Sequence, residues 1–384
     1  MNIRKLNALN TLIEKQRDEG KLQGASIIVE HKGKRVYENY YEPDRPDSIY
    51  KIFSMTKPVT SVAAMILYER GQLDLMSSVA DYLPGYANCS VVSADGIRRA
   101  QNRITVRDLL NMTSGIVYPG EFGEAERLML KVEKEAKAQI SSGILKSNVD
   151  VCNKLAEAGV AFEPGELFRY GHSAEILGGV IEVVSGMKLS DFYKKEIFTP
   201  LNMEDTDFKI GEGKEFRAAV LYRRDKNGKV VRAEDDVRRR LEMENPTREP
   251  WFEQGGAGLY STANDYAHFA QMLLNKGSYH GKEIIGRRTF EFMTSPQLTP
   301  EQLKGNDFEA CIGFNYGNLF RILENPALAT SNGSIGEFGW DGMCGTYFFV
   351  DPTEELIFIY MQQIEGGADY SFIRGLKHIV YGAC

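Results

Sequence analysis

Strand patterns at both ends of the chain constrain its fold more than any other feature of the sequence. Apolar and polar residues alternate on either side of His31-Lys32-Gly33, which is typical of two strands joined by a tight turn. A second alternating pair surrounds Asp351-Pro352. Because helical patterns fill the region between these hairpins, the sequence predicts one antiparallel sheet built from the two chain ends and flanked by helices, with a large helical insertion.

Helical spacing of apolar residues frames this predicted sheet. The first twenty positions predict an opening helix, and residues 370–381 predict a final one. The chain has 384 residues, a length that suggests two lobes. We therefore predict an α+β protein in which residues 1–75 and 305–384 form a sheet domain and residues 76–304 form a mostly helical inserted domain.

Two charged stretches lie inside the insertion. Residues 121–146 keep a few apolar positions among many charges, which predicts an exposed helix over the lobe. Residues 225–249 combine an acidic run with a basic one. We interpret this second stretch as a solvated surface excursion, with a substrate-gating segment or a dimer contact as the alternative.

The composition excludes several classes of partner. Lysine and arginine number 46 against 53 acidic residues, so the net charge of −7 argues against nucleic acid. The longest uncharged apolar stretch, near residues 59–68, is about half the ~20 residues that cross a bilayer. Five scattered cysteines without a C-x-x-C pair and five histidines without ligand spacing predict a cytoplasmic protein with no metal or other cofactor.

The tetrad that runs from Ser54 to Lys57 is the first candidate for chemistry. Residues three apart share one face of a helix, so the amine of Lys57 can reach the hydroxyl of Ser54. Two other Ser-x-x-Lys tetrads compete, one starting at Ser48 in a predicted strand and one at Ser185 at a predicted helix end. Ser54 alone directly precedes a strong helical run, where its backbone N–H is free to bind a developing oxyanion.

A serine hydroxyl becomes a nucleophile when a base removes its proton. The sequence lacks the G-x-S-x-G elbow, which argues against an α/β-hydrolase. In a Ser-Lys site the usual helper is a tyrosine whose pKa is lowered by the lysine charge. Tyr170 fits this role because it lies in a predicted loop just ahead of a helix; a buried core tyrosine is the common alternative.

Five segments in order resemble the serine hydrolases of the class C β-lactamase and penicillin-binding type, most closely the family VIII carboxylesterases. The resemblance extends over residues 24–381 and rests on segments 53–75, 104–116, 163–186, 255–277 and 338–352. It implies a two-lobed class C β-lactamase-like fold, in agreement with the strand and helix patterns. The glycine run at 255–258 is interpreted as a tight turn ahead of a helix, because no Gly-Lys-Ser/Thr follows it.

Carried over residue by residue, the resemblance implies the catalytic roles. Ser54 would be the acylated nucleophile, and Lys57 would orient and deprotonate it. Tyr170 would shuttle protons between Ser54, the leaving group and the attacking water. The N–H of Met343, which follows the family's third motif, would pair with that of Ser54 as an oxyanion hole.

The third motif aligns with Trp340-Asp341-Gly342 and bears on the substrate. β-Lactamases and transpeptidases carry lysine or histidine at its first position, where the cation helps to hold a substrate carboxylate, whereas the esterases carry tryptophan. We therefore expect neutral esters to be favoured and Asp341 to repel anionic acyl groups. Simple packing of Trp340 at a strand end and a solvent-facing Asp341 are the alternatives.

Two further residues are candidates for substrate binding. His172 stands where the lactamases often have an asparagine that donates to the substrate; we expect it to face solvent, with a hydrogen bond to substrate or Lys57 as the alternative. Tyr118 stands where the family's helical lobe lines the cleft, and we expect a wall residue.

The sequence thus predicts a serine carboxylesterase that cleaves small esters through an acyl-enzyme on Ser54. Hydrolysis of β-lactams or D-amino-acid peptides by the same residues is the close alternative, and a non-catalytic binding homologue is the more distant one. The expected partner is a small-molecule ester, with no nucleic acid and no membrane.

Overall fold

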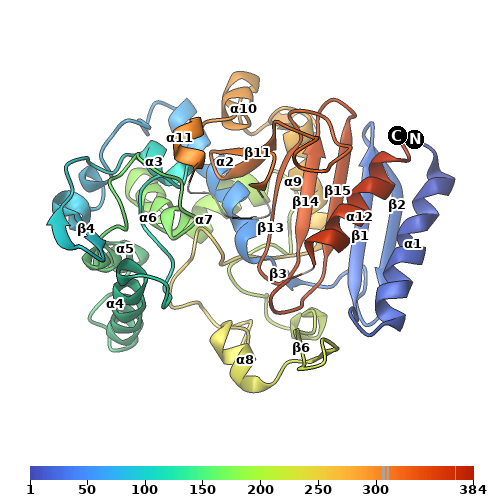
Figure 1. The fold of residues 1–384 in the computed structure, drawn as a ribbon, viewed down its shortest axis with the longest axis horizontal. Helices are drawn as coiled ribbons and strands as arrows, with labels where there is room; N and C mark the ends of the chain where they lie inside the picture. Colours follow the sequence, from blue (N-terminus) through green and yellow to red (C-terminus); the bar gives the residue numbers. More distant parts are fainter. Residues whose placement is uncertain (305–307, 309–310, 368) are drawn as a thin grey trace.

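An antiparallel sheet lies beside a group of helices in the computed structural model, which describes residues 1–304, 308, 311–367 and 369–384 (Figure 1). The predicted domain boundary at residue 305 lies outside the described residues. Both chain ends lie together beside the opening and final helices, at the end of the molecule away from the helices of residues 106–193 (Figure 1). The α+β class predicted from the two hairpins is confirmed.

The sheet joins strands from the two ends of the sequence. Its seven strands have the order β11-β12-β13-β14-β15-β1-β2. Pairing of β1 with β15, antiparallel from Ser26 opposite Met361 to His31 opposite Leu356, connects the two predicted hairpins. The strands are β1 Ala25–His31, β2 Lys34–Tyr41, β11 Phe314–Gly317, β12 Phe320–Leu323, β13 Phe338–Asp341, β14 Tyr347–Asp351 and β15 Leu356–Met361.

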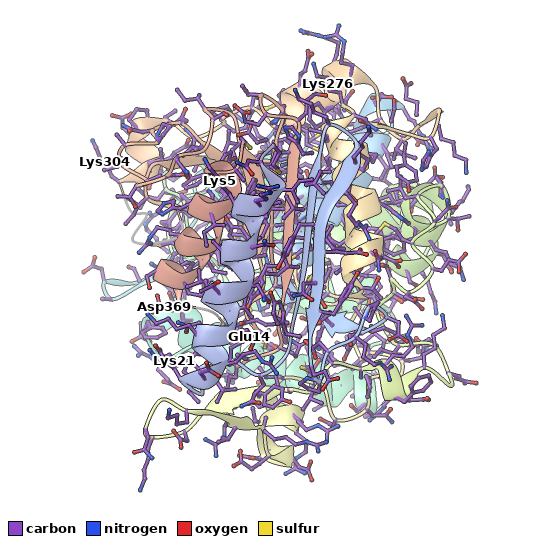
Figure 2. The ribbon with its side chains drawn as sticks, turned by 90° about the vertical axis from the view of Figure 1, so that its right-hand side faces the viewer. Lys5, Glu14, Lys21, Lys276, Lys304 and Asp369 are labelled. Carbon is purple, nitrogen blue, oxygen red and sulfur yellow. The ribbon has the colours of Figure 1, made fainter. Side chains whose placement is uncertain are left out.

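The opening and final helices cover one face of this sheet. Helices α1 (Ile3–Asp18) and α12 (Tyr370–Tyr381) lie side by side on it, as Figure 2 shows. Each buries an apolar stripe at helical spacing against the strands, with Leu9 of α1 and Leu376 of α12 fully buried. These two helices are confirmed in the positions that the sequence predicts.

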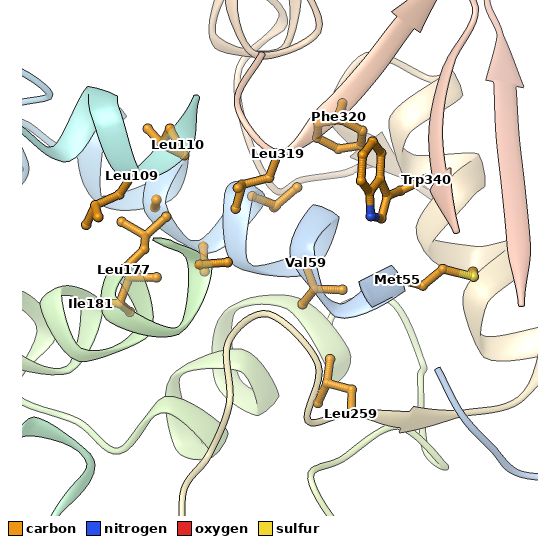
Figure 3. Packing of buried hydrophobic residues seen from close by; sticks show 14 of the residues in the cluster. Met55, Val59, Leu109, Leu110, Leu177, Ile181, Leu259, Leu319, Phe320 and Trp340 are labelled. Carbon is orange, nitrogen blue, oxygen red and sulfur yellow. The ribbon is translucent and has the colours of Figure 1, made fainter. Parts of the chain in front are cut away.

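The opposite face of the sheet supports the region that holds Ser54. Helix α9 (Ala263–Leu274), from the predicted insertion, packs against β1, β14 and β15. Helix α2 (Thr56–Glu69) connects the sheet to the helical lobe and is buried along nearly its whole length. Figure 3 shows Met55 and Val59 close to Trp340 of β13 at one end of this packing, and Leu109, Leu177 and Ile181 at the other.

In the helical lobe, α2, α3, α5 and α7 pack against α6, and α4 packs against α5. The helix predicted within residues 121–146 is α4, which buries Met129, Val132 and Ala136 on one face and exposes the other. The helices of the lobe are α3 Val106–Leu110, α4 Glu124–Ser141, α5 Asn148–Leu155, α6 Ser173–Ser185 and α7 Leu189–Tyr193.

Shorter elements complete the described chain. They are the strand pairs β3 Tyr50–Lys51 with β8 Tyr260–Ser261, β4 Ser90–Ser93 with β5 Gly96–Arg99, β6 Tyr222–Arg224 with β7 Val230–Arg232, and β9 Ser278–Tyr279 with β10 Lys282–Glu283, and the helices α8 Asp235–Arg240, α10 Arg287–Met293 and α11 Pro300–Leu303.

The charged stretch 225–249 is not the solvated excursion that the sequence predicts. The turn between β6 and β7 and the charged face of α8 are exposed. By contrast, Val237, Leu241 and Met243 are buried in a small cluster with Phe53. This packing places the segment beside Ser54. The solvated interpretation is therefore wrong for the second half of the stretch.

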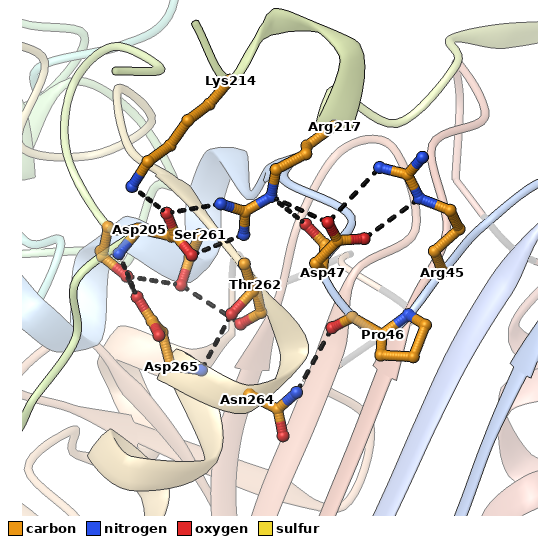
Figure 4. A network of polar contacts seen from close by, with 11 residues as sticks. Arg45, Pro46, Asp47, Asp205, Lys214, Arg217, Ser261, Thr262, Asn264 and Asp265 are labelled. Carbon is orange, nitrogen blue, oxygen red and sulfur yellow. Dashed lines mark hydrogen bonds and ion pairs between the residues drawn. The ribbon is translucent and has the colours of Figure 1, made fainter. Parts of the chain in front are cut away.

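A polar network anchors the start of α9 to the loop before β3 (Figure 4). The guanidinium of Arg217 makes a bidentate contact with Asp205, at 2.9 and 2.5 Å, and also contacts Asp47. The backbone N–H of Asp205 donates to Asp265, whose own N–H donates to the side chain of Thr262 as a helix cap. The network thus holds β8 and the turn that precedes it.

No helix among residues 1–304, 308, 311–367 and 369–384 has the length and apolar character to cross a bilayer.

Removal of one hydroxyl should loosen α12 from the sheet. The hydroxyl of Tyr381 lies 2.6 Å from Glu337 Oε2 and 2.8 Å from Asp351 Oδ2, and both carboxyl groups are buried. Tyr381→Phe removes the donor of the buried Glu337 Oε2, so we expect the free energy of unfolding to fall by about 1–3 kcal/mol in urea denaturation. Tyr40→Phe, which removes an exposed hydroxyl 3.3 Å from Glu38, is the control and should change it by less than about 0.5 kcal/mol. Equal effects of the two changes would contradict this account.

Candidate active site

Ser54 sits in a single 3₁₀ turn, Phe53–Met55, which leads directly into α2. Phe53 has φ +44°, a left-handed conformation that a bulky side chain rarely adopts, and this turn presents Ser54 to a cavity of about 620 Å³. The candidate residues that line the cavity are Ser54, Tyr118, Tyr170, His172, Asp341, Gly342 and Met343. The structure thus brings together residues that the sequence places almost 290 positions apart.

Lys57 lies one helical turn beyond Ser54 and is fully buried. Its Nζ is 3.2 Å from Ser54 Oγ, 2.9 Å from Tyr118 Oη and 2.8 Å from the carbonyl oxygen of Gly256. Burial lowers the pKa of Lys57 to about 8, although the charges of Glu175 and Asp341 act in the opposite direction. A large fraction of this amine is therefore neutral in mildly alkaline solution, with a lone pair available to the serine proton.

Tyr170 reaches the cavity from the loop before α6, as its sequence position indicates. Its hydroxyl accepts a hydrogen bond of 3.1 Å from the indole N–H of Trp340. Burial raises the pKa of Tyr170, and hydrogen bonds with Ser54 and Trp340 only partly offset this effect. The expectation of a phenol with a lowered pKa is therefore wrong, because burial disfavours the charged phenolate. Tyr170 keeps its proton and can act as a donor.

Trp340 supports Tyr170 and does not line the cavity. It is fully buried, and its ring lies 5.4 Å from that of Tyr170 between centroids. The expectation that it contacts substrate is therefore corrected: the indole packs behind the phenol and donates to it. The alternative prediction, simple packing of Trp340 at a strand end, accounts for its burial but not for its hydrogen bond to Tyr170.

Gly342 and Met343 follow β13 in a turn that is held against the serine. The N–H of Gly342 donates to the carbonyl of Thr346, whose hydroxyl donates to the carbonyl of Ile52. A Cβ on Gly342 would overlap this same carbonyl, so only glycine allows such a close approach of the two segments. Met343 thereby lines the same cavity as Ser54, and an oxyanion hole formed by their two N–H groups stays a prediction.

Asp341 is paired with a buried arginine. Its carboxylate accepts a hydrogen bond of 2.6 Å from Arg321, whose guanidinium also lies over the rings of Trp340 and Tyr347. The expected repulsion of anionic acyl groups assumed an uncompensated charge at Asp341. The pairing overturns that assumption, and it also excludes a purely solvent-facing Asp341.

Tyr118 and His172 differ from the sequence expectations. Tyr118 is more than a wall residue, because its hydroxyl accepts a hydrogen bond from Lys57. His172 does not face solvent: it is only 7% exposed and lies between Glu133 and Glu175. Its ring forms an edge contact with that of Tyr118, with 4.6 Å between centroids.

Sequence reasoning missed Gly256 and Glu175. The glycines at 255, 256 and 258 were expected to serve a turn, yet each stands where a Cβ would overlap a neighbouring segment, and Gly256 also offers its carbonyl to Lys57. The carboxylate of Glu175 fills the space that a side chain at 256 would need. A glutamate on the otherwise apolar face of a helix, three residues after His172, was the available signal.

Neither of the two competing Ser-x-x-Lys tetrads forms a serine-lysine pair in the structure, although Lys51 lines the cavity. Lys51 contacts the carbonyls of Leu241 and Glu242, and the tetrad at Ser185 spans the end of α6, with Gly186 in the left-handed conformation. Across the described ranges, no group of three or more His, Cys, Asp or Glu side chains has the geometry of a metal site.

A serine beside a buried lysine thus lies at the junction of an antiparallel sheet and a helical lobe, as in a serine hydrolase of the beta-lactamase fold. The beta-lactamase family model matches residues 9–378, and the chain belongs to this family. The predicted relation to the class C β-lactamase and family VIII carboxylesterase group is thereby confirmed, with the support of an esterase relative.

That relative is esterase EstB of Burkholderia gladioli, 27% identical over 369 residues, which cover 89% of this chain and 86% of EstB. Two solved structures share the fold. EstCE1, described as a hydrolase with promiscuous acyltransferase activity, has a TM-score of 0.81 and 22% identity over 99% of both chains. Simvastatin synthase LovD from Aspergillus terreus has a TM-score of 0.81 and 21% identity over 98% of both chains.

A methyl group at position 256 should disturb the site and the fold together. Gly256→Ala forces the carboxylate of Glu175 to move, so we expect the free energy of unfolding to fall by about 1–3 kcal/mol, measured by urea denaturation. Gly211→Ala is the matched control, because its Cβ would meet only the flexible end of Lys214 at ordinary contact distance. A Gly256→Ala variant as stable as the control would show that the turn adapts freely.

Proposed function

We propose that this protein is a serine carboxylesterase that cleaves small, neutral carboxylic esters through an acyl-enzyme on Ser54. The observation that carries the proposal is the approach of the buried Lys57 amine to within 3.2 Å of Ser54 Oγ, with a pKa of about 8 for that amine. A neutral amine in this position can accept the serine proton and so activate the nucleophile.

Acylation begins with attack of Ser54 Oγ on the ester carbonyl carbon. Neutral Lys57 takes the hydroxyl proton, while its N–H groups keep their bonds to Tyr118 and the Gly256 carbonyl. The backbone N–H groups of Ser54 and Met343 receive the negative charge that develops on the carbonyl oxygen. Each such donor typically contributes on the order of 10²–10³ in rate.

Collapse of the tetrahedral intermediate breaks the bond to the alcohol. The leaving oxygen takes the phenolic proton of Tyr170, and the proton that Lys57 gained restores the phenol. Trp340 holds the phenol in place for this relay through its indole N–H. In the second half-reaction a water molecule gives its proton to the same pair, attacks the acyl carbon, and releases the acid and Ser54.

The lining of the cavity supports neutral ester substrates. Tyr118, Tyr170, Phe308, Leu241 and Met343 provide aromatic and apolar surface around Ser54. The third motif carries Trp340 in place of a cation that would hold a carboxylate. The ester-cleaving relative EstB agrees with this choice of substrate class.

Hydrolysis of β-lactams by the same residues is the second candidate, favoured by the family to which the chain belongs. Turnover of nitrocefin at a rate comparable to that of p-nitrophenyl butyrate would favour it over the esterase. A homologue without catalysis is the third candidate, and the failure of a fluorophosphonate probe to label the protein would support it.

Removal of the nucleophile should abolish both turnover and labelling. We expect Ser54→Ala to lower kcat for p-nitrophenyl butyrate by about 10³-fold or more, because the acyl-enzyme can no longer form. Intact mass spectrometry should show one fluorophosphonate adduct on the wild type and none on this variant. The control is Ser185→Ala, in a competing tetrad away from the cavity, which should keep activity and labelling. Full activity of Ser54→Ala would overturn the proposal.

The reaction should depend on pH through Lys57. Below a pKa of about 8 the amine carries a proton and lacks the lone pair that activates Ser54, so kcat/KM should rise as the pH increases through this value. At two units below the pKa about one amine in a hundred is neutral, and we expect a rate about a hundredfold below the alkaline plateau. Initial rates with a neutral ester between pH 6 and 10 measure this limb, and a flat profile would exclude Lys57 as the base.

A further inference from the structure

The imidazole of His172 lies between two carboxylates in the wall of the cavity. Its Nε2 is 3.4 Å from Glu133 Oε2, and its Nδ1 is 3.7 Å from Glu175 Oε2. Glu133 comes from α4 and Glu175 from the first turn of α6, so two elements converge on one ring. Because an acceptor faces each ring nitrogen, only the doubly protonated imidazolium can offer an N–H to both sides.

The charges on His172, Glu133 and Glu175 interact strongly because water has little access to the centre of this cluster. His172 and Glu175 are almost completely buried, and their polar side-chain atoms form no hydrogen bond of normal length in the described part of the chain. A neutral imidazole would therefore leave one of the two carboxylates facing a ring-nitrogen lone pair, which is unfavourable. The N-terminus of α6 opposes a positive charge on His172, but two nearby anions favour it more strongly.

The titration of the cluster agrees with this geometry. Burial lowers the pKa of His172, but Glu133 and Glu175 outweigh it and raise the pKa to about 9. Burial likewise raises the pKa of Glu175, but His172 and Lys57 together lower it. At neutral pH His172 is thus a cation beside the anionic Glu175.

Glu175 links this cluster to the base. Its carboxylate lies against Gly256, whose carbonyl accepts the hydrogen bond from Lys57. The negative charge of Glu175 favours the protonated form of Lys57, which is the inactive form of a base. The other charged group that acts on Lys57 is Asp341, and Arg321 neutralises it. Tyr118, the remaining titratable group against the imidazole, keeps its proton because burial raises its pKa.

We propose that His172, held as an imidazolium between Glu133 and Glu175, is a positioning residue that offsets the charge of Glu175 and thereby sets the pH at which Lys57 acts as a base. The proposal rests on the proposed esterase function and deepens it. His172 itself touches neither Ser54 nor the substrate carbonyl; it acts through Glu175.

Variants that change one charge test the proposal. The measured quantity is the acid limb of the pH profile, which is the pH range over which kcat/KM for p-nitrophenyl butyrate rises to its alkaline plateau. His172→Gln leaves Glu175 uncompensated, so we expect the limb to move up by about one pH unit, with about a tenfold loss at pH 7 that is recovered above pH 9.5. Glu175→Gln should move the limb down. The double variant His172→Gln/Glu175→Gln should return it close to the wild-type position, because the compensated pair is removed as a whole.

Two variants of α4 complete the set. Glu133→Gln weakens the hold on the imidazolium and should move the limb in the same direction as His172→Gln, by a smaller amount. Glu135→Gln is the matched control, since Glu135 pairs with Lys154 and does not face the cluster, and its limb should coincide with that of the wild type. A purely structural role of His172 predicts a lower plateau with an unmoved limb, and that result would overturn the proposal.

A second measurement does not depend on turnover or on the folding of a variant. In wild-type protein labelled with ¹⁵N-histidine, one of the five histidines should keep the imidazolium chemical shift on both nitrogens at pH 8. Absence of such a signal refutes the proposal even if His172→Gln fails to fold. If the wild-type protein does not hydrolyse esters, the proposed esterase function is refuted instead. The spectrum alone then decides whether His172 is an imidazolium.

Discussion

The burial of a single amine is the constraint on which the site depends. An ammonium group removed from water is stable only where hydrogen-bond acceptors surround it, and Lys57 has three: a serine, a tyrosine and a backbone carbonyl. They come from the turn before α2, the loop at Tyr118 and the glycine turn at Gly256. Their convergence fixes the two lobes around one nitrogen, and the same burial makes this nitrogen a useful base near neutral pH.

Burial also acts on Tyr170, but there it raises the pKa, whereas it lowers the pKa of Lys57. Burial disfavours the charged form of every group, so it weakens the hold of the amine on its proton and strengthens that of the phenol. The two side chains thus differ in role because they differ in the sign of their charged form. In the proposed mechanism, one environment thereby provides both the base and the acid that act on Ser54 and its substrate.

Features that depend on neighbours in the sequence were predictable. The spacing of Ser54 and Lys57, the opening and final helices and both hairpins follow from local periodicity, which the chain obeys closely. The failures concern pairs that are distant in sequence. The tertiary fold makes the hydrogen bond from Trp340 to Tyr170 and the ion pair between Asp341 and Arg321. No local sequence pattern indicates either interaction. The prediction that residues 237–243 are solvated is wrong for the same reason, because their apolar side chains pack against Phe53, which is distant in the sequence.

The pairing of β1 with β15 has a consequence for how the molecule acquires its activity. These central strands come from opposite ends of the sequence, so the sheet closes only after nearly the whole chain is available. The turn that carries Gly342 and Met343 belongs to the late-synthesised part, whereas Ser54 and Lys57 belong to the early part. Under the proposed mechanism, a nascent chain therefore contains its nucleophile long before it contains the second N–H of the oxyanion hole.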